Sequence, residues 1–230
     1  STAVVEGTVY VGGQGNAVYA LKAAEGAEQW RFETGDWVIS SPAVVDGTVY
    51  VGCNDNTVYA LDASDGSQQW QFETGGLLFS GESVVSSPAV VDDTVYVGCG
   101  NGKVYALAAS DGSQQWQFET GDVYVHSSPA VVGSTVYIGS GDGNVYALAD
   151  SDGSQQWQFE TGDGVFSSPA VVGGTVYVGS NDNTVYAISA EDGIEQWSYR
   201  TEDKVRSQPT VIYNTVYVAS SDGNVYALSE

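Results

Sequence analysis

The chain contains a single histidine, His126, so little of its chemistry can involve an imidazole. A serine-nucleophile triad needs that imidazole held between a serine hydroxyl and a carboxylate. Serine and aspartate are plentiful, but the sequence contains no G-x-S-x-G turn that would present a nucleophile. We therefore interpret His126 as a surface or channel residue, assign no catalytic residue, and predict that the protein is not an enzyme.

Metal-binding patterns are also missing from the sequence. Cys53 and Cys99 occupy the same place in two successive repeats, where later repeats have Ser140 and Ser180. Two cysteines without further ligands do not make a zinc site, so we interpret them as small side chains at strand ends. Acidic turns such as 142–144 lack the spaced oxygen ligands of a calcium loop. We predict neither a metal nor a cofactor.

The residues that could recognise a ligand precede each Ser-Pro or Gln-Pro pair. There the otherwise similar repeats differ, with a valine flanked by variable residues. Drift in tolerant loops would produce the same variation, but loops on rigid scaffolds also carry function. Aromatic and cationic groups in such loops suit a peptide or small molecule. The predicted ligand-binding residues are Trp37, Phe79, Tyr124, His126, Phe166, Lys204 and Arg206.

A repeated unit of about 40 residues must position these loops. Each unit has four short runs rich in valine, tyrosine, threonine and aromatic residues, which favour β-strands. Asp-Gly and Asn-rich turns separate the runs. Near the end of a full unit stands a tryptophan that we expect to anchor the outer strand between neighbouring units. These five structural tryptophans are Trp30, Trp70, Trp116, Trp157 and Trp197.

The two middle strands of each unit are apolar at successive positions, as in Val49-Tyr50-Val51. Both faces of the sheet must therefore be buried, which a sandwich or open barrel does not require. The sequence predicts an all-β fold, a six-bladed β-propeller of four-stranded antiparallel blades with a three-stranded sixth blade. We expect one domain, 1–230, with repeats at 1–40, 41–86, 87–127, 128–167, 168–207 and 208–230.

The segment from Ala60 to Trp70 resembles the tryptophan-docking motif of PQQ-like propeller repeats, in which alanine, aspartate, glycine and tryptophan recur at these spacings. The resemblance covers the whole chain. That family includes quinoprotein dehydrogenases and BamB-type assembly proteins. The segment S-S-P-A-V-V-D-G-T-V-Y-V-G is similar in sequence to repeat proteins of halophilic archaea. A quinoprotein would be expected to have eight blades and adjacent cysteines, whereas this sequence has six repeats and separated cysteines.

Three functions follow from the sequence and the resemblance. The first is a non-enzymatic binding or scaffold propeller, extracytoplasmic, whose partner is a protein, a peptide or a small molecule. The second is a quinoprotein-type oxidoreductase domain, which would gain quinone absorbance when PQQ and Ca²⁺ are added. The third is an artificial or recently amplified repeat protein without a selected ligand. We expect a monomer, with an edge-paired dimer as a minor form.

Acidity dominates the composition, with 29 aspartates and glutamates against six lysines and arginines and a formal net charge of −23. Such a field repels nucleic-acid phosphates and anionic lipid surfaces. No apolar run approaches the roughly 20 residues of a membrane helix, so we predict neither nucleic-acid binding nor membrane insertion. High salt would screen the self-repulsion, which favours a salt-loving source.

The charge generates a first testable prediction. We expect the melting temperature to rise from dilute buffer to molar KCl, because counterions screen repulsion within the acidic chain. Differential scanning calorimetry across a KCl series measures this effect. A melting temperature independent of KCl would contradict the interpretation of the charge as salt adaptation.

Overall fold

The computed structural model describes residues 1–75, 83–121 and 124–229, and every regular element in these ranges is a β-strand. The strands are β1 Thr2–Val5, β2 Thr8–Gly13, β3 Ala17–Lys22, β4 Glu28–Glu33, β5 Ala43–Val45, β6 Thr48–Gly52, β7 Thr57–Asp62, β8 Gln68–Glu73, β9 Ala89–Val91, β10 Thr94–Gly98, β11 Lys103–Ala108, β12 Gln114–Glu119, β13 Ala130–Val132, β14 Thr135–Gly139, β15 Asn144–Ala149, β16 Gln155–Glu160, β17 Ala170–Val172, β18 Thr175–Gly179, β19 Thr184–Ser189, β20 Glu195–Arg200, β21 Thr210–Ile212, β22 Thr215–Ala219 and β23 Val225–Ser229.

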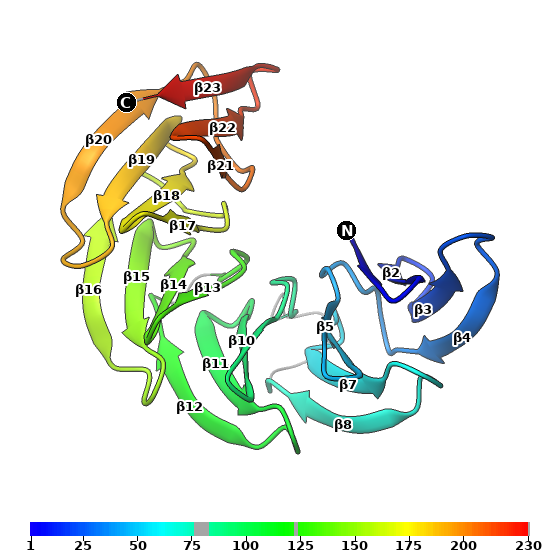
Figure 1. The fold of residues 1–230 in the computed structure, drawn as a ribbon. Coiled ribbons are helices and arrows are strands. Elements are labelled where there is room, and N and C mark those ends of the chain that lie inside the picture. Colours follow the sequence, from blue (N-terminus) through cyan, green and yellow to red (C-terminus); the bar gives the residue numbers. More distant parts are fainter. Residues whose placement is uncertain (76–82, 122–123, 230) are drawn as a thin grey trace. The chain divides into compact units, whose positions relative to one another are not determined.

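These strands form six antiparallel sheets, each made of consecutive strands (Figure 1). Five sheets have four strands, and the last, β21-β22-β23, has three. This arrangement confirms the six-bladed β-propeller fold that the repeat predicts, with its three-stranded sixth blade. Each sheet is called a blade below and is numbered from blade 1 to blade 6 in chain order.

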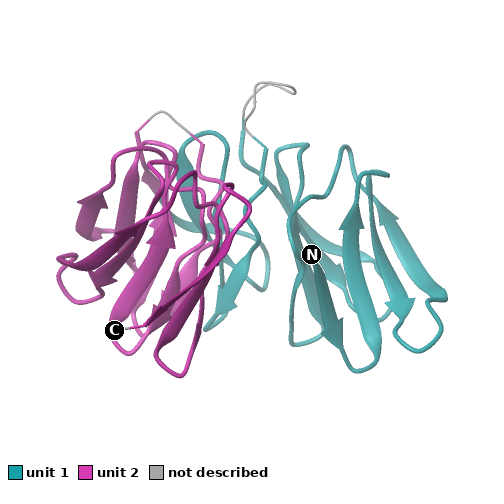
Figure 2. Ribbon diagram, turned by 90° about the horizontal axis from the view of Figure 1, so that it is seen from above, with its two compact units in different colours: residues 1–117 teal, residues 118–230 magenta. Residues whose placement is uncertain are grey.

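The chain divides into two compact units, residues 1–117 and 118–230, with the boundary inside β12 (Figure 2). Within the first unit, β5 lies between β1 and β9; within the second, β17 lies between β13 and β21. The first strands of successive blades are therefore neighbours, as expected for the innermost strands of a propeller. The assignment of all six repeats to one domain stays a prediction.

The hairpins and burial follow from the repeat. Asp46 and Gly47, between β5 and β6, have φ values of 48° and 75°, the left-handed pair of a tight hairpin turn. Every residue of β6 is buried, and β7 is buried up to its last residue. Because both faces of the middle strands are covered, these strands carry no polar-apolar alternation.

An irregular register places each outer-strand tryptophan. In blade 2, Ala60 pairs with Trp70, but the next residue, Leu61, pairs with Gln68, so Gln69 is an extra residue on the outer strand. The same shift occurs in blades 1, 4 and 5. The side-chain amide oxygen of Gln69 accepts a 3.1 Å hydrogen bond from Thr48 Oγ1 on β6. The bulge thus sets the tryptophan in register and ties the outer strand to the second strand.

The tryptophan contacts the following blade. Trp70 is 7% exposed, and its indole Nε1 donates a 2.7 Å hydrogen bond to the carbonyl of Ala109 in blade 3. A Cβ added to Gly112 would lie 2.6 Å from the indole, so the blade 3 turn passes directly over the ring. Trp30 and Trp157 make the corresponding bonds to Ala63 and Ala190.

These contacts predict a large stability difference between two tryptophans of the first unit. Trp70→Ala should lower the free energy of unfolding by about 3–5 kcal/mol, because it leaves a cavity and an unpaired carbonyl. Trp37, 44% exposed, should change it by no more than about 0.5 kcal/mol when replaced by alanine. Urea denaturation in molar KCl measures both, and equal losses would contradict the assigned packing.

Candidate functional site

The loops that enter each blade from the preceding outer strand share one buried valine. In the second unit these are Val125, Val165 and Val205, all fully buried. A Cβ added to Gly139 would lie 2.5 Å from Val165, and one added to Gly179 would lie 2.3 Å from Val205. Val165 and Val205 therefore each contact a glycine at the end of the previous blade's second strand, where only a glycine leaves room for the valine.

Two backbone hydrogen bonds hold the loop before blade 5 at the peptide group that joins Gly164 to Val165. The Val165 N–H donates to Ser140 O at 2.8 Å, and the Asn181 N–H donates to Gly164 O at 3.0 Å. The loop before blade 6 repeats both bonds. The backbone is thus tied to the turns of two blades, while the two side chains flanking the valine are free of these bonds. The flanking positions can vary without disturbing the packing.

Four flanking side chains in the second unit form a continuous row. The Tyr124 and His126 rings are stacked with centroids 5.2 Å apart, and the His126 and Phe166 centroids are 5.7 Å apart. The guanidinium carbon of Arg206 lies 5.6 Å from the Phe166 centroid. These four residues come from three successive loops, and we call them the rim row. The sequence selected all four as ligand-binding residues, and the structure brings them together.

Residues that the sequence analysis did not select support this row. The Arg206 Nε donates a 2.8 Å hydrogen bond to Oδ1 of Asn181, in the turn between β18 and β19. The Phe166 ring lies over the backbone of Gly141 and Gly164, where an added Cβ would be 3.4 Å and 3.2 Å from the ring. Asn181 and Gly141 occupy equivalent positions in the turns between second and third strands. The residue at this position varies between repeats, and that variation could have identified these supporting residues from the sequence.

Trp37 and Lys204, the other selected residues that the structure describes, make different contacts. Trp37 belongs to the first unit, where its carbonyl accepts a hydrogen bond from the Asn54 N–H. Lys204 flanks Val205 and is half-buried, with its N–H donating to Asp203 Oδ1. Phe79 lies outside the described residues. In the first unit, Asn54 Oδ1 is buried without a hydrogen-bond donor among the described residues.

The aspartates of the turns between second and third strands connect blades. Asp142 Oδ2 accepts hydrogen bonds from the Gly121 N–H at 2.8 Å and from Tyr146 OH at 2.7 Å. Burial acts to raise the pKa of Asp142, but the hydrogen bonds from Tyr146, Asn144 and Gly121 outweigh it and leave the pKa lowered. The same pair of bonds recurs at Asp182, and burial with the Asp182 bond raises the pKa of Tyr186 to about 12. The sequence predicts only the turns that these aspartates form, whereas their bonds to the previous blade join residues about 20 positions apart and are seen only in the structure.

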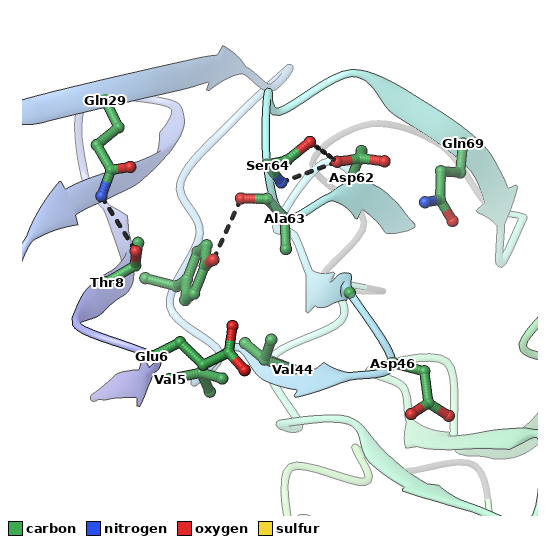
Figure 3. Close-up of a pocket in the computed structure, with 12 residues that line it drawn as sticks. Val5, Glu6, Thr8, Gln29, Val44, Asp46, Asp62, Ala63, Ser64 and Gln69 are labelled. Atoms are coloured by element: carbon green, nitrogen blue, oxygen red, sulfur yellow. Dashed lines mark hydrogen bonds between the residues drawn. The ribbon is translucent and has the colours of Figure 1, made fainter.

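A cleft of about 800 Å³ lies in the first unit, at the ends of the blades that carry the turns between first and second strands (Figure 3). Glu6, Asp46 and Asp62 are among its lining residues. Asp62 accepts hydrogen bonds from the backbone and the hydroxyl of Ser64, and Tyr10 OH donates to Ala63 O (Figure 3). These bonds form a turn and an interblade contact, and they converge on no common point as ligands of an ion would.

Reactive groups elsewhere in the described residues are inert or isolated. Cys53 and Cys99 are buried thiols that form no disulfide in the described chain, and burial raises the pKa of Cys53 to about 12. A thiol with such a pKa stays protonated and is a poor nucleophile at neutral pH. Within residues 1–75, 83–121 and 124–229, no cluster of three histidine, cysteine or acidic side chains could hold a metal ion. The same ranges contain no helix that could span a bilayer.

Comparison with known proteins agrees with this architecture. The family model described as outer membrane protein assembly factor BamB matches residues 1–123 and 111–230, so the chain belongs to this family of propeller proteins. The crystal structure of BamB from Moraxella catarrhalis is similar over 100% of this chain and 69% of that one, with 21% identity and a TM-score of 0.85. The computationally designed protein Ika8 is similar over 100% and 70%, with 16% identity and a TM-score of 0.87. A comparison with curated proteins gave no match.

The rim row predicts a specific pH dependence. Burial lowers the pKa of His126 from its ordinary 6.5, because the folded protein favours the neutral ring. The unfolded chain therefore binds this proton more readily, so the contribution of His126 to stability is present above about pH 6.5 and is lost as the pH falls through the lowered pKa.

Urea denaturation of the wild type and of His126→Phe, at about pH 7.5 and about pH 5, tests this sign. The wild type should lose more free energy of unfolding between the two conditions than the variant loses, because only the wild type carries the imidazole. Identical losses in the two proteins would show that His126 is not desolvated in the folded state.

Proposed function

We propose that the protein is a non-enzymatic binding propeller whose rim row recognises a segment of a partner protein. The observation that carries the proposal is the position of Arg206. Its guanidinium stacks on Phe166 and its Nε bonds to an amide, yet it forms no ion pair in the described part of the chain. In a chain with 29 acidic residues, a cation held without a carboxylate is available for an anion from outside.

The chemistry of the row defines the ligand class. An arginine fork binds a carboxylate through two parallel hydrogen bonds, and its bond to Asn181 orients the fork. Three aromatic rings lie beside it, those of Tyr124, His126 and Phe166, and the Tyr124 residue is 44% exposed. The combination suits a carboxylate next to an aromatic or apolar group, as in an acidic-aromatic peptide segment or a chain terminus.

The family supports a role in interactions between proteins. Its named member is an assembly factor for outer membrane proteins, and we extend from it only the scaffold role and an extracytoplasmic location. The rigid loop backbone supports the same proposal, because binding residues on a fixed frame lose little conformational entropy when a ligand arrives.

A small probe tests the proposal directly. N-acetyl-L-phenylalanine carries a carboxylate next to an aromatic ring, and its amide is the matched neutral compound. Because His126 is the only histidine, its imidazole proton resonances report on the row without assignment of the whole spectrum. Titration in molar KCl should shift these resonances with the acid and not with the amide, since only the carboxylate pairs with Arg206.

Two arginine variants separate the row from general charge effects. Arg206→Gln should weaken binding of the probe roughly tenfold or more, because the bidentate partner is lost. Arg200→Gln, on the exposed outer strand β20 of the same unit, is the control and should leave binding unchanged. Equal binding of acid and amide, or equal effects of the two variants, would contradict the proposed site.

A further inference from the structure

Trp197 differs from the other outer-strand tryptophans because the blade that follows it has no outer strand among the described residues. Blade 6 ends with β23, which pairs with β22 alone (Figure 1). One side of β23 therefore has backbone N–H and C=O groups without a strand partner in the described chain. Such an edge is open to pairing with another extended segment.

Within each unit, the copies of the repeat show what normally covers this tryptophan. In the blade that follows, a glycine in the turn before the outer strand passes over the indole. Added Cβ atoms on Gly66, Gly112 and Gly193 would lie 2.6–2.8 Å from Trp30, Trp70 and Trp157, respectively. All three glycines have positive φ, between 71° and 74°. The carbonyl that accepts the indole N–H lies just before the same turn.

At Trp197 these partners are missing from the described residues. Its Nε1 is buried and has no hydrogen-bond acceptor there. The position equivalent to the accepting Ala63 is Glu230, which lies outside the described residues. Leu228 of β23 is partly exposed, whereas its counterparts Leu61 and Leu148 are fully buried.

A groove of about 550 Å³ marks the place of the missing strand. It is lined on one side by Trp197, Ser198 and Tyr199 of β20 and on the other by Ala227, Leu228 and Ser229 of β23. A side-chain acceptor for Thr215 of β22 is also missing among the described residues. The corresponding threonines Thr48 and Thr175 donate to the bulged glutamine of their own outer strand, but Thr215 has no such glutamine among the described residues.

We propose that this groove binds an extended segment of the repeat's own outer-strand type, which completes blade 6 by adding a fourth strand beside β23. The outer strands of the other blades show which residues such a segment needs. A glycine must precede the strand to pass over Trp197, a glutamine must meet Thr215, and a tryptophan and a phenylalanine must follow. Residues 65–75, 111–121 and 152–162 of this chain have this composition and are identical.

Ala219 indicates that the occupant is a strand rather than a whole further repeat. In blades 1, 2, 4 and 5 this position is a glycine, against which the valine of the following loop packs. A Cβ there would lie 2.3–2.5 Å from that valine. Ala219 carries this Cβ, so a following loop of the same kind does not fit, while the groove along β23 remains open to a strand.

The test uses a synthetic peptide with the sequence of residues 110–121, labelled at its N-terminus, added to the full chain in molar KCl to screen charge repulsion. Fluorescence polarisation should show saturable 1:1 binding, and the Trp197 indole N–H resonance should shift because the peptide's glycine turn covers the ring. The matched peptide with Gly112→Val should have an affinity at least roughly tenfold lower, because the added Cβ would collide with the indole.

Variants of the chain complete the test. Trp197→Ala removes the indole that the peptide's glycine turn covers, so it should weaken peptide binding, while Trp157→Ala, at an indole already covered by Gly193, should leave it unchanged. The inference is overturned if the peptide does not bind, if the Gly112→Val peptide binds equally well, or if light scattering shows a dimer that closes β23 with a second copy of the chain. Because the rim row is assayed separately, either proposal can fail without the other.

Discussion

The contact between a tryptophan and the next blade is the interaction on which the rest of the structure depends. An antiparallel blade with apolar residues on both faces is not stable alone, since it buries neither face. The tryptophan covers this apolar surface at the outer edge, where successive blades diverge and the space between them is largest. It fills that space, covers the turn glycine and donates to a backbone carbonyl, as Trp30 does to Ala63. The outer-strand bulge, the turn glycine and the glutamine contact all serve this one packing arrangement.

The valine in each entering loop has the corresponding role at the other end of the blade. It is buried against a glycine and held by two backbone bonds, so the loop is rigid although it has no regular structure. The side chains of its neighbours in sequence take no part in the glycine contact or in these backbone bonds. This separation of roles explains how near-identical repeats can present Tyr124, His126, Phe166 and Arg206 on one unit without loss of stability. Binding chemistry can change while the scaffold stays the same.

The acidic composition also has a structural component. The carboxylates of Asp55, Asp142, Asp182 and Asp222 accept hydrogen bonds from a backbone N–H of the previous blade and from a tyrosine hydroxyl. Others form turns, as Asp111 does with the Ser113 N–H. Part of the negative charge therefore holds the blades together as fixed acceptors. The remaining exposed carboxylates produce the repulsion that salt screens.

The sequence by itself determined the blades, their number and the three-stranded last blade, because strand propensity, turn residues and two-sided apolarity are local properties repeated six times. It also identified the variable loop positions, since comparison between repeats needs no coordinates. Only the tertiary structure decided which of those residues meet. The rim row depends on the spacing of three loops, on the glycine surface under Phe166 and on the bond between Arg206 and Asn181, which are 25 positions apart. The three-stranded last blade predicts that no outer strand of blade 6 covers Trp197, but the unpartnered indole Nε1 and the groove beside it are seen only in the structure.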